Sequence, residues 1–285
     1  MKSVRICVAA ITAGVVCIAV MLGILSAAIY AENESGDSFI GLMYHQVLKD
    51  ESRAGKYIIT PNELESDLAY LSENGYVSVL PSQLVRIREQ GGRLPEKTVV
   101  ITFDDGYETG LYYVLPLLKK YGMKAVINVV GSYTDEYSQI NEEGRHLSYA
   151  YLTWDEIRKL SDSGYVEIGN HTYDMHSNNG DRNGCARKEN ESDEQYRTVL
   201  YEDVDRLSDK LQQVTGKRPV AFAYPFGSLS EGSAEIIGSA GISVFMTCCE
   251  QPCSMNRNGR IVINRYNRES GRTAQQICEE FKNAF

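Results

Sequence analysis

The chain lacks the excess of positive charge that nucleic-acid binding requires. Its 285 residues include 29 Lys and Arg against 38 Asp and Glu, which gives a net charge of -9 at pH 7. Proteins that bind phosphates concentrate Lys and Arg on their surface, so the sequence predicts no nucleic-acid partner. Internal repeats and low-complexity tracts are also absent. The hydrophobic content of 43 % is ordinary for one large globular domain or two small ones.

Cysteine pairs with the two-residue spacing of structural zinc sites are missing as well. Beyond the N-terminal apolar segment the sequence has an odd number of cysteines: Cys185, Cys248, Cys249, Cys253 and Cys278. An odd set cannot pair completely within one chain. A local disulfide and buried thiols are both compatible with this pattern, and the sequence does not decide between them.

Charge is absent from residues 6–31, which are mostly apolar and follow two basic residues. A helix needs about 20 apolar residues to span a bilayer, whereas the core of a signal peptide has about 7–15. Basic residues in front of such a segment keep that end in the cytoplasm. We therefore expect residues 1–31 to be a membrane anchor, or a signal peptide if cleaved, residues 32–38 a polar linker, and 39–285 an extracytoplasmic domain, secreted after cleavage.

Strand-like and helix-like segments alternate through this domain. Thr60 caps the clearest helix, Pro61 takes its first position, Glu63 completes a capping box and Gly75 ends it. About seven segments are strand-like: 39–47, 98–103, 124–131, 165–171, 220–227, 242–249 and 260–267. The alternation predicts an α/β fold in which parallel strands form a closed barrel with helices outside. Chemistry in such barrels lies where strands end.

Two adjacent carboxylates, Asp104 and Asp105, follow the apolar segment "VVITF". Like charges this close raise each other's pKa unless a cation compensates them. His171 and His176 follow another strand-like segment, and they converge only if the chain loops back after His171. Each pair alone is typical of an ordinary turn or surface loop. Together, two imidazoles and one carboxylate suit Zn²⁺ or a similar ion, and the second carboxylate is free to act as a base.

The motifs "TFDDGY", "GNHTYDMH" and "FAYPFG" resemble the polysaccharide deacetylases of the NodB-homology type, carbohydrate esterase family 4, over residues from about 40 to 267. The resemblance implies a distorted (β/α) barrel of about seven parallel strands. It also implies a hydrolase that removes N-acetyl groups from an extracellular or cell-wall amino-sugar polymer. Poly-N-acetylglucosamine, peptidoglycan and chitooligosaccharides are the candidate partners.

By position, the resemblance makes Asp104 the catalytic base. It makes Asp105, His171 and His176 the ligands of one divalent metal, with Zn²⁺ preferred and Co²⁺ or Ni²⁺ possible. The backbone N–H near Phe226 matches the donor that helps to hold the oxyanion. A non-catalytic carbohydrate-binding barrel and an O-acetyl esterase that uses the same site are the alternative functions.

The sequence departs from the family pattern at three places. His171 and His176 are five residues apart instead of four, which, with "LMYHQV", resembles the branch that deacetylates poly-N-acetylglucosamine. The usual arginine before the Pro-aromatic-Gly turn is Ala223, so Arg265 is our candidate to orient and ionise Asp104, with a surface arginine as the alternative. The family's C-terminal histidine is absent too.

His45 is our candidate for the general acid in place of that missing histidine. It ends the first strand-like segment, so it should emerge at the same rim of the barrel as the metal ligands. We expect a neighbouring carboxylate to raise its pKa, with a structural histidine as the alternative. Tyr107, Tyr173 and Tyr224 flank the motifs and are candidates for stacking on sugar rings, although packing would explain them equally well.

Overall fold

The computed structural model describes residues 38–284 except 179, 181 and 256–258. The predicted N-terminal helix, residues 1–31, lies outside the described residues, as does nearly all of the predicted linker. Among the described residues, no helix has both the length and the apolar character needed to cross a membrane.

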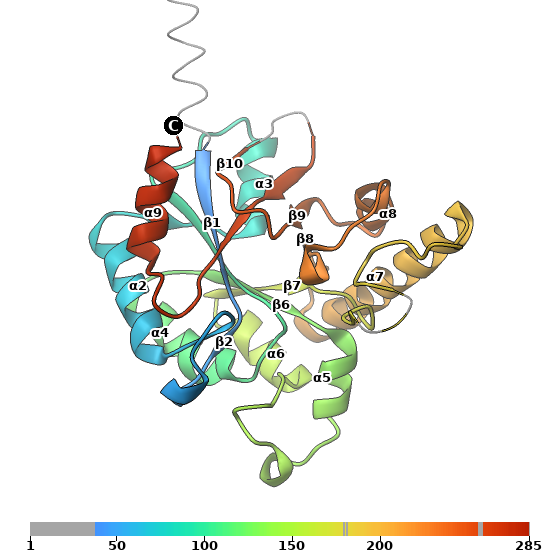
Figure 1. Ribbon diagram of the computed structural model, residues 1–285, viewed down its shortest axis with the longest axis horizontal. Helices are drawn as coiled ribbons and strands as arrows, with labels where there is room; N and C mark the ends of the chain where they lie inside the picture. Colours follow the sequence, from blue (N-terminus) through green and yellow to red (C-terminus); the bar gives the residue numbers. More distant parts are fainter. Residues whose placement is uncertain (1–37, 179, 181, 256–258, 285) are drawn as a thin grey trace, which may run out of the picture.

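A mostly parallel sheet that curls into a nearly closed barrel forms the centre of the molecule (Figure 1). Its strands, in spatial order, are β1 (Ser38–Tyr44), β5 (Thr98–Phe103), β6 (Ala125–Val129), β7 (Val166–Asn170), β8 (Ala221–Ala223), β9 (Val244–Met246) and β11 (Ile261–Ile263). β12 (Arg265–Asn267) then pairs in parallel with β1, so the sheet returns to its first strand. The predicted α/β class and barrel-like sheet are confirmed.

Three of the predicted strands are wrong in detail. The segment 220–227 is a strand only as far as Ala223, because residues 225–227 form a helical turn. The segment 260–267 splits at Asn264, because β11 pairs with β9 while β12 pairs with β1. β1 and β12 can approach closely only because position 41 is glycine: a Cβ on Gly41 would lie 2.3 Å from the Asn264 carbonyl oxygen. The segment 39–47 is interrupted at His45: β1 ends at Tyr44, and Gln46–Val47 form a separate short strand.

Short strands complete the fold. β2 (Gln46–Val47) pairs with β3 (Ile58–Ile59), β4 (Val77–Ser78) lies parallel to β5, and β10 (Cys253–Ser254) runs antiparallel to β1.

Helices cover the outside of the sheet. They are α2 (Pro61–Glu73), α3 (Pro81–Glu89), α4 (Leu115–Tyr121), α5 (Gly131–Tyr137), α6 (Trp154–Asp162), α7 (Asp193–Thr215), α8 (Ser233–Ser239) and α9 (Ala274–Asn283), with single turns η1 (Glu51–Arg53), η2 (Gly110–Val114), η3 (Glu142–Gly144) and η4 (Pro225–Gly227). α2, α4 and α9 lie together on one side, and α7 and α8 on another (Figure 1). The predicted capping box is confirmed, because Thr60 and Glu63 exchange side-chain and backbone hydrogen bonds.

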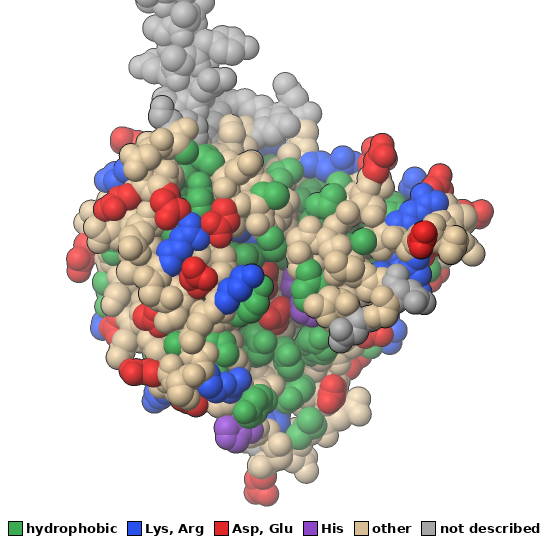
Figure 2. All heavy atoms as spheres, viewed as in Figure 1, with side chains coloured by type: hydrophobic (Ala, Val, Ile, Leu, Met, Phe, Trp, Pro, Cys, Tyr) green, Lys and Arg blue, Asp and Glu red, His purple; other side chains and the backbone are tan. Residues whose placement is uncertain are grey.

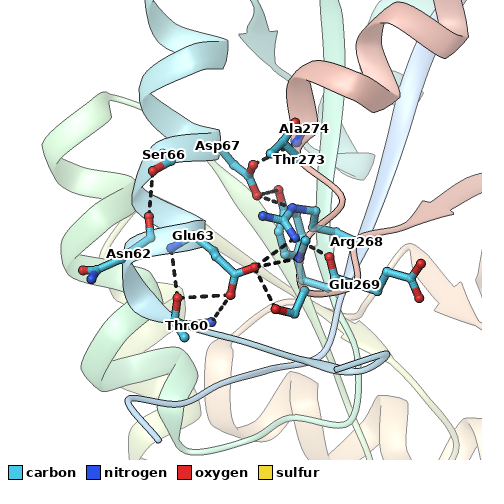
Figure 3. Close-up of polar contacts among 12 residues, drawn as sticks. Thr60, Asn62, Glu63, Ser66, Asp67, Arg268, Glu269, Thr273 and Ala274 are labelled. Carbon is cyan, nitrogen blue, oxygen red and sulfur yellow. Dashed lines mark hydrogen bonds and ion pairs between the residues drawn. The ribbon is translucent and has the colours of Figure 1, made fainter. Parts of the chain in front are cut away.

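A buried ion pair ties α2 to the C-terminal part of the chain (Figure 3). Asp67 accepts hydrogen bonds from Arg268 Nε at 2.7 Å, from the Tyr44 hydroxyl at 3.1 Å and from the Ala274 N–H at 2.8 Å. The backbone N–H of Arg268 donates to the Met43 carbonyl at 2.9 Å. These contacts join the start of α9 and the end of β12 to the end of β1, close to the predicted site.

Replacing Arg268 by Met should lower the free energy of unfolding by about 3–5 kcal/mol, because the buried Asp67 carboxylate would lose its counter-charge. Urea denaturation at pH 7 measures this. Adding Asp67→Asn to Arg268→Met should recover most of the loss, since no buried charge remains. Arg158→Met serves as a control, because its ion pair with Asp155 is exposed and should matter little. An Arg268→Met protein as stable as the control would contradict the prediction.

Candidate active site

The ends of several barrel strands bring the predicted polar residues into one cleft. The cleft has a volume of about 520 Å³, and its lining includes His45, Asp104, Asp105, His171 and His176. Figure 2 shows acidic and histidine side chains together in a hollow near the centre of this face, with hydrophobic side chains below it. Residues that are far apart in the sequence therefore meet at one edge of the barrel.

Asp105, His171 and His176 form a compact group of possible metal ligands. Asp105 Oδ1 lies 3.5 Å from His171 Nε2 and 3.1 Å from His176 Nε2, and the three ligand atoms lie within 4.8 Å of one another. Asp105 (φ 71°) and Thr172 (φ 73°) both adopt the left-handed conformation, so the chain turns sharply after each strand. The predicted return of the loop from His171 to His176 is present.

The hydrogen bonds around this group suit a metal. His171 Nδ1 lies 2.8 Å from the Ala223 carbonyl oxygen, so Nδ1 carries the proton and Nε2 is left to bind an ion. Two imidazole nitrogens and a carboxylate oxygen match the donors that Zn²⁺ and similar ions prefer. Burial alone would raise the pKa of Asp105, but its close contacts with the His171 and His176 rings outweigh burial and lower that pKa. Asp105 is therefore an anion ready to bind a cation.

Asp104 lies beside these ligands and carries its own counter-charge. Its side chain is 3 % exposed, and its Oδ1 accepts hydrogen bonds from Arg265 Nη1 at 2.7 Å and Asn128 Nδ2 at 2.7 Å. Burial raises the pKa of Asp104, but the charges of Arg265 and His171 and the hydrogen bond from Arg265 hold it at about 2. Because both donors use Oδ1, Oδ2 is left to accept a proton.

Arg265 reaches this carboxylate from β12. Its side chain is fully buried, and it also donates to the Thr247 carbonyl at 2.9 Å and to the Thr102 hydroxyl at 3.1 Å. The contact with Asp104 that we expected is present. The alternative of a surface arginine is wrong, because β12 pairs with β1 and directs this side chain into the barrel.

His45 is at the cleft, as expected from its place after β1. Its ring lies 4.7 Å from the ring of Tyr57, and no described residue offers a hydrogen bond to its Nδ1. The expected rise of its pKa is wrong: burial lowers the pKa, and the opposing charges of Asp105 and Asp104 do not compensate. His45 is therefore mainly neutral near pH 7 in this state.

Phe226 and Tyr107 also line the cleft. Phe226 is 47 % exposed, and its ring lies 4.7 Å from that of His176. Tyr107 stacks on Tyr151 with ring centres 4.9 Å apart. Both residues are therefore placed where a ligand in the cleft would meet them.

Tyr173 and Tyr224 do not line the cleft, which corrects their assignment to sugar stacking. Tyr173 is 8 % exposed, and its hydroxyl donates to Asp135 at 2.6 Å. Tyr224 is 3 % exposed and packs edge-to-face on Phe222. Tyr224 belongs to an apolar cluster with residues of α7 and α8, and the Tyr173 ring packs against the guanidinium group of Arg206, 3.6 Å from the ring centre.

Two features of the site escaped the sequence analysis. Asn128 stands in the middle of the apolar strand β6, and that polar interruption was the available signal. A Cβ on Gly169 would lie 2.0 Å from Asn128 Oδ1, so the glycine in the neighbouring strand leaves room for this amide. Cys248 lines the cleft as an exposed free thiol. The other cysteines of the described chain are also free, and Cys185, Cys253 and Cys278 are buried.

A family model described as polysaccharide deacetylase matches residues 91–245, more than half of the chain. The chain belongs to the polysaccharide deacetylase family. This membership agrees with the resemblance seen in the motifs. The matched region contains Asp104, Asp105, His171, His176 and Phe226, whereas His45 and Arg265 lie outside it.

Curated relatives include the poly-beta-1,6-N-acetyl-D-glucosamine N-deacetylase of Escherichia coli (strain K12). It is 27 % identical over 231 residues, which cover 74 % of this chain and 34 % of the relative. The chain thus spans about a third of that protein's length. The protein of the same name from Staphylococcus aureus (strain MRSA252) is 22 % identical over 241 residues, or 80 % of this chain and 77 % of the relative.

Solved structures of similar proteins include a de-N-acetylase from Aggregatibacter actinomycetemcomitans. Its TM-score is 0.73 at 27 % identity, covering 87 % of this chain and 100 % of that one. A Streptococcus pyogenes deacetylase matches with a TM-score of 0.67 at 21 % identity, covering 85 % of this chain and 97 % of that one, and shows the same fold.

Proposed function

We propose that this chain is a metal-dependent hydrolase that removes N-acetyl groups from an extracellular amino-sugar polymer, with poly-N-acetylglucosamine as the preferred candidate. The observation that carries the proposal is the convergence of Asp105, His171 and His176, with ligand atoms within 4.8 Å, beside a second carboxylate that Arg265 keeps ionised. The names of the Escherichia coli and Staphylococcus aureus relatives support the substrate class.

The proposed roles divide the site between binding an ion and moving protons. When bound, Zn²⁺, Co²⁺ or Ni²⁺ supplies Lewis-acid polarisation and lowers the pKa of water. Asp104 Oδ2 takes a proton from the water that attacks the acetamide carbonyl, while the Phe226 N–H stabilises the oxyanion. His45, which burial keeps mainly neutral in the empty site, has to take up a proton before it gives one to the departing amine. The products are acetate and a free amino sugar.

The proposal includes the location of the barrel relative to the cell membrane. The uncharged residues 6–31 support an N-terminal membrane anchor, or a signal peptide, with the barrel on the extracytoplasmic side. Protease treatment of intact cells that express the chain tests the orientation. Degradation of the barrel by external protease is expected, and full protection would contradict the proposed setting.

Acetate release from defined substrates tests the function. The purified chain with added Zn²⁺ or Co²⁺ should release acetate from oligomers of β-1,6-linked N-acetylglucosamine. Chitooligosaccharides and peptidoglycan measure substrate preference. Release only from O-acetylated glycans would identify an esterase instead, and polymer binding without release would identify a non-catalytic barrel.

Replacing His45 by Ala should lower the rate of amide cleavage by about 10²-fold or more, because the amine needs a proton to leave. The same variant should hydrolyse activated acetate esters at nearly the wild-type rate, since their leaving groups need no proton. Comparing kcat on an N-acetylated oligomer and on an activated ester measures both effects. Unchanged metal content is the control. An amide rate close to wild type would remove His45 from the mechanism.

A further inference from the structure

A second hollow opens beside the cleft and shares a wall with it. Its volume is about 500 Å³. His176, Asn178 and Phe226 line both spaces. The rest of its wall comes from the start of α5 and from the loop after β7: Ser132, Tyr133, Asp174 and Ser177. A chain molecule bound in the cleft could therefore continue across Phe226 into this hollow.

Phe226 forms the wall between the two spaces, and its backbone conformation is energetically unfavourable. Phe226 has φ 58°, a left-handed value that a bulky residue rarely adopts, yet its side chain is 47 % exposed. The turn around it is held by hydrogen bonds from Gly227 N–H to the Tyr224 carbonyl and from Ser228 N–H to the Pro225 carbonyl. An exposed ring on a backbone held in an unfavourable conformation indicates a role in ligand binding rather than in core packing. Hydroxyl and amide groups beside a ring suit a sugar.

The second hollow is negatively charged. Asp174 is exposed, and its backbone N–H donates to Asp203 Oδ2 at 2.8 Å, which fixes this part of the loop. No Lys or Arg is among the described residues that line this hollow, whereas Lys56 lines the cleft. The hollow therefore favours a ligand that carries positive charge.

We propose that this hollow is a subsite for the sugar unit next to the one being deacetylated, and that Asp174 selects a neighbour whose amine is already free. The inference rests on the proposed function. Deacetylation turns a neutral unit into a glucosamine whose ammonium group can pair with this carboxylate. Each reaction thus creates the preferred ligand of the second hollow, so free amines should accumulate in adjacent positions along the polymer.

Pentamers of β-1,6-linked N-acetylglucosamine test this inference. One pentamer is fully acetylated, and others carry a single glucosamine at a known position. The full chain should deacetylate the unit beside the glucosamine with a kcat/KM about 3- to 5-fold above that of the fully acetylated pentamer, the effect of a partly exposed ion pair. The advantage should fade at 0.5 M salt, because ionic screening weakens such pairs.

Asp174→Asn should bring the ratio of the two kcat/KM values close to one. Asp162→Asn, at the end of α6 and outside both spaces, is the matched control and should keep the wild-type ratio. A wild-type ratio of one or less, or a ratio that survives in Asp174→Asn, would overturn the inference. Acetate release at equal kcat/KM from both kinds of pentamer would contradict this inference but leave the proposed function standing. No release from any pentamer would contradict the proposed function as well.

Discussion

Asp104→Asn should reduce acetate release by about 10²–10⁴-fold while the protein keeps its affinity for Zn²⁺. The side-chain oxygen of Asn is still able to accept the hydrogen bond from Arg265, so the site should keep its shape. It would have no carboxylate there to take a proton from water. Kinetics with N-acetylated oligomers and isothermal titration with Zn²⁺ measure the two properties separately.

Alanine variants of the three proposed metal ligands are the comparison for Asp104→Asn. Asp105→Ala, His171→Ala and His176→Ala should each abolish tight binding of Zn²⁺, because each removes one of the three proposed protein ligands. Their loss of activity would then follow from the loss of the ion. If Asp104→Asn loses Zn²⁺ as completely as Asp105→Ala, the roles of the two carboxylates are reversed.

Arg265→Met should move the acidic limb of the pH–rate profile upward by a pH unit or more. In the wild type, Arg265 helps to hold the pKa of Asp104 at about 2 against burial. Without this cation burial dominates, so the pKa rises and the base becomes protonated at higher pH. The wild-type limb of Asp104 lies below pH 4, so a limb that appears in the kcat/KM profile between pH 4 and 9 only in Arg265→Met measures the shift. An unchanged limb in a correctly folded variant would rule out this role.

The same pair should contribute to stability, with a predictable sign. The folded-state pKa of Asp104 lies below its ordinary value of 3.8. Its stabilising effect is therefore complete above about pH 4 and is lost as the pH falls toward 2. Breaking the pair with Arg265→Met should cost about 3–5 kcal/mol of unfolding free energy at neutral pH. The double variant Asp104→Asn with Arg265→Met should recover much of that stability but none of the activity.

The local signals in the sequence predicted α2 well, because capping is decided by nearby residues. The box of Thr60 and Glu63 needed no tertiary information. The division of 260–267 into β11 and β12 was not predictable in this way. Both halves are equally strand-like, and only closure of the barrel gives them different partners.

The site residues that lie at the ends of strands were predictable, because the carboxyl ends of parallel strands lie at the same rim of the barrel. Asp104, Asp105 and His171 are of this kind. Adjacency in sequence was a poor guide to the other residues, because neighbouring residues on a strand point to opposite faces. Tyr224 lies near the site in sequence and yet packs outside the barrel. The pKa of His45 depends on burial, which the sequence does not report.

The pairing of β12 with β1 also has a consequence for how the chain acquires activity. The contact between Arg265 and Asp104 spans 161 residues, and Arg265 lies on β12, the most C-terminal of the described strands. Contacts this distant form slowly, since a large loop must close first. Until β12 docks against Gly41, the barrel would contain an aspartate without its counter-charge. We therefore expect hydrolysis to appear late in refolding, after most helical signal has returned, and at the same rate as burial of the C-terminal segment.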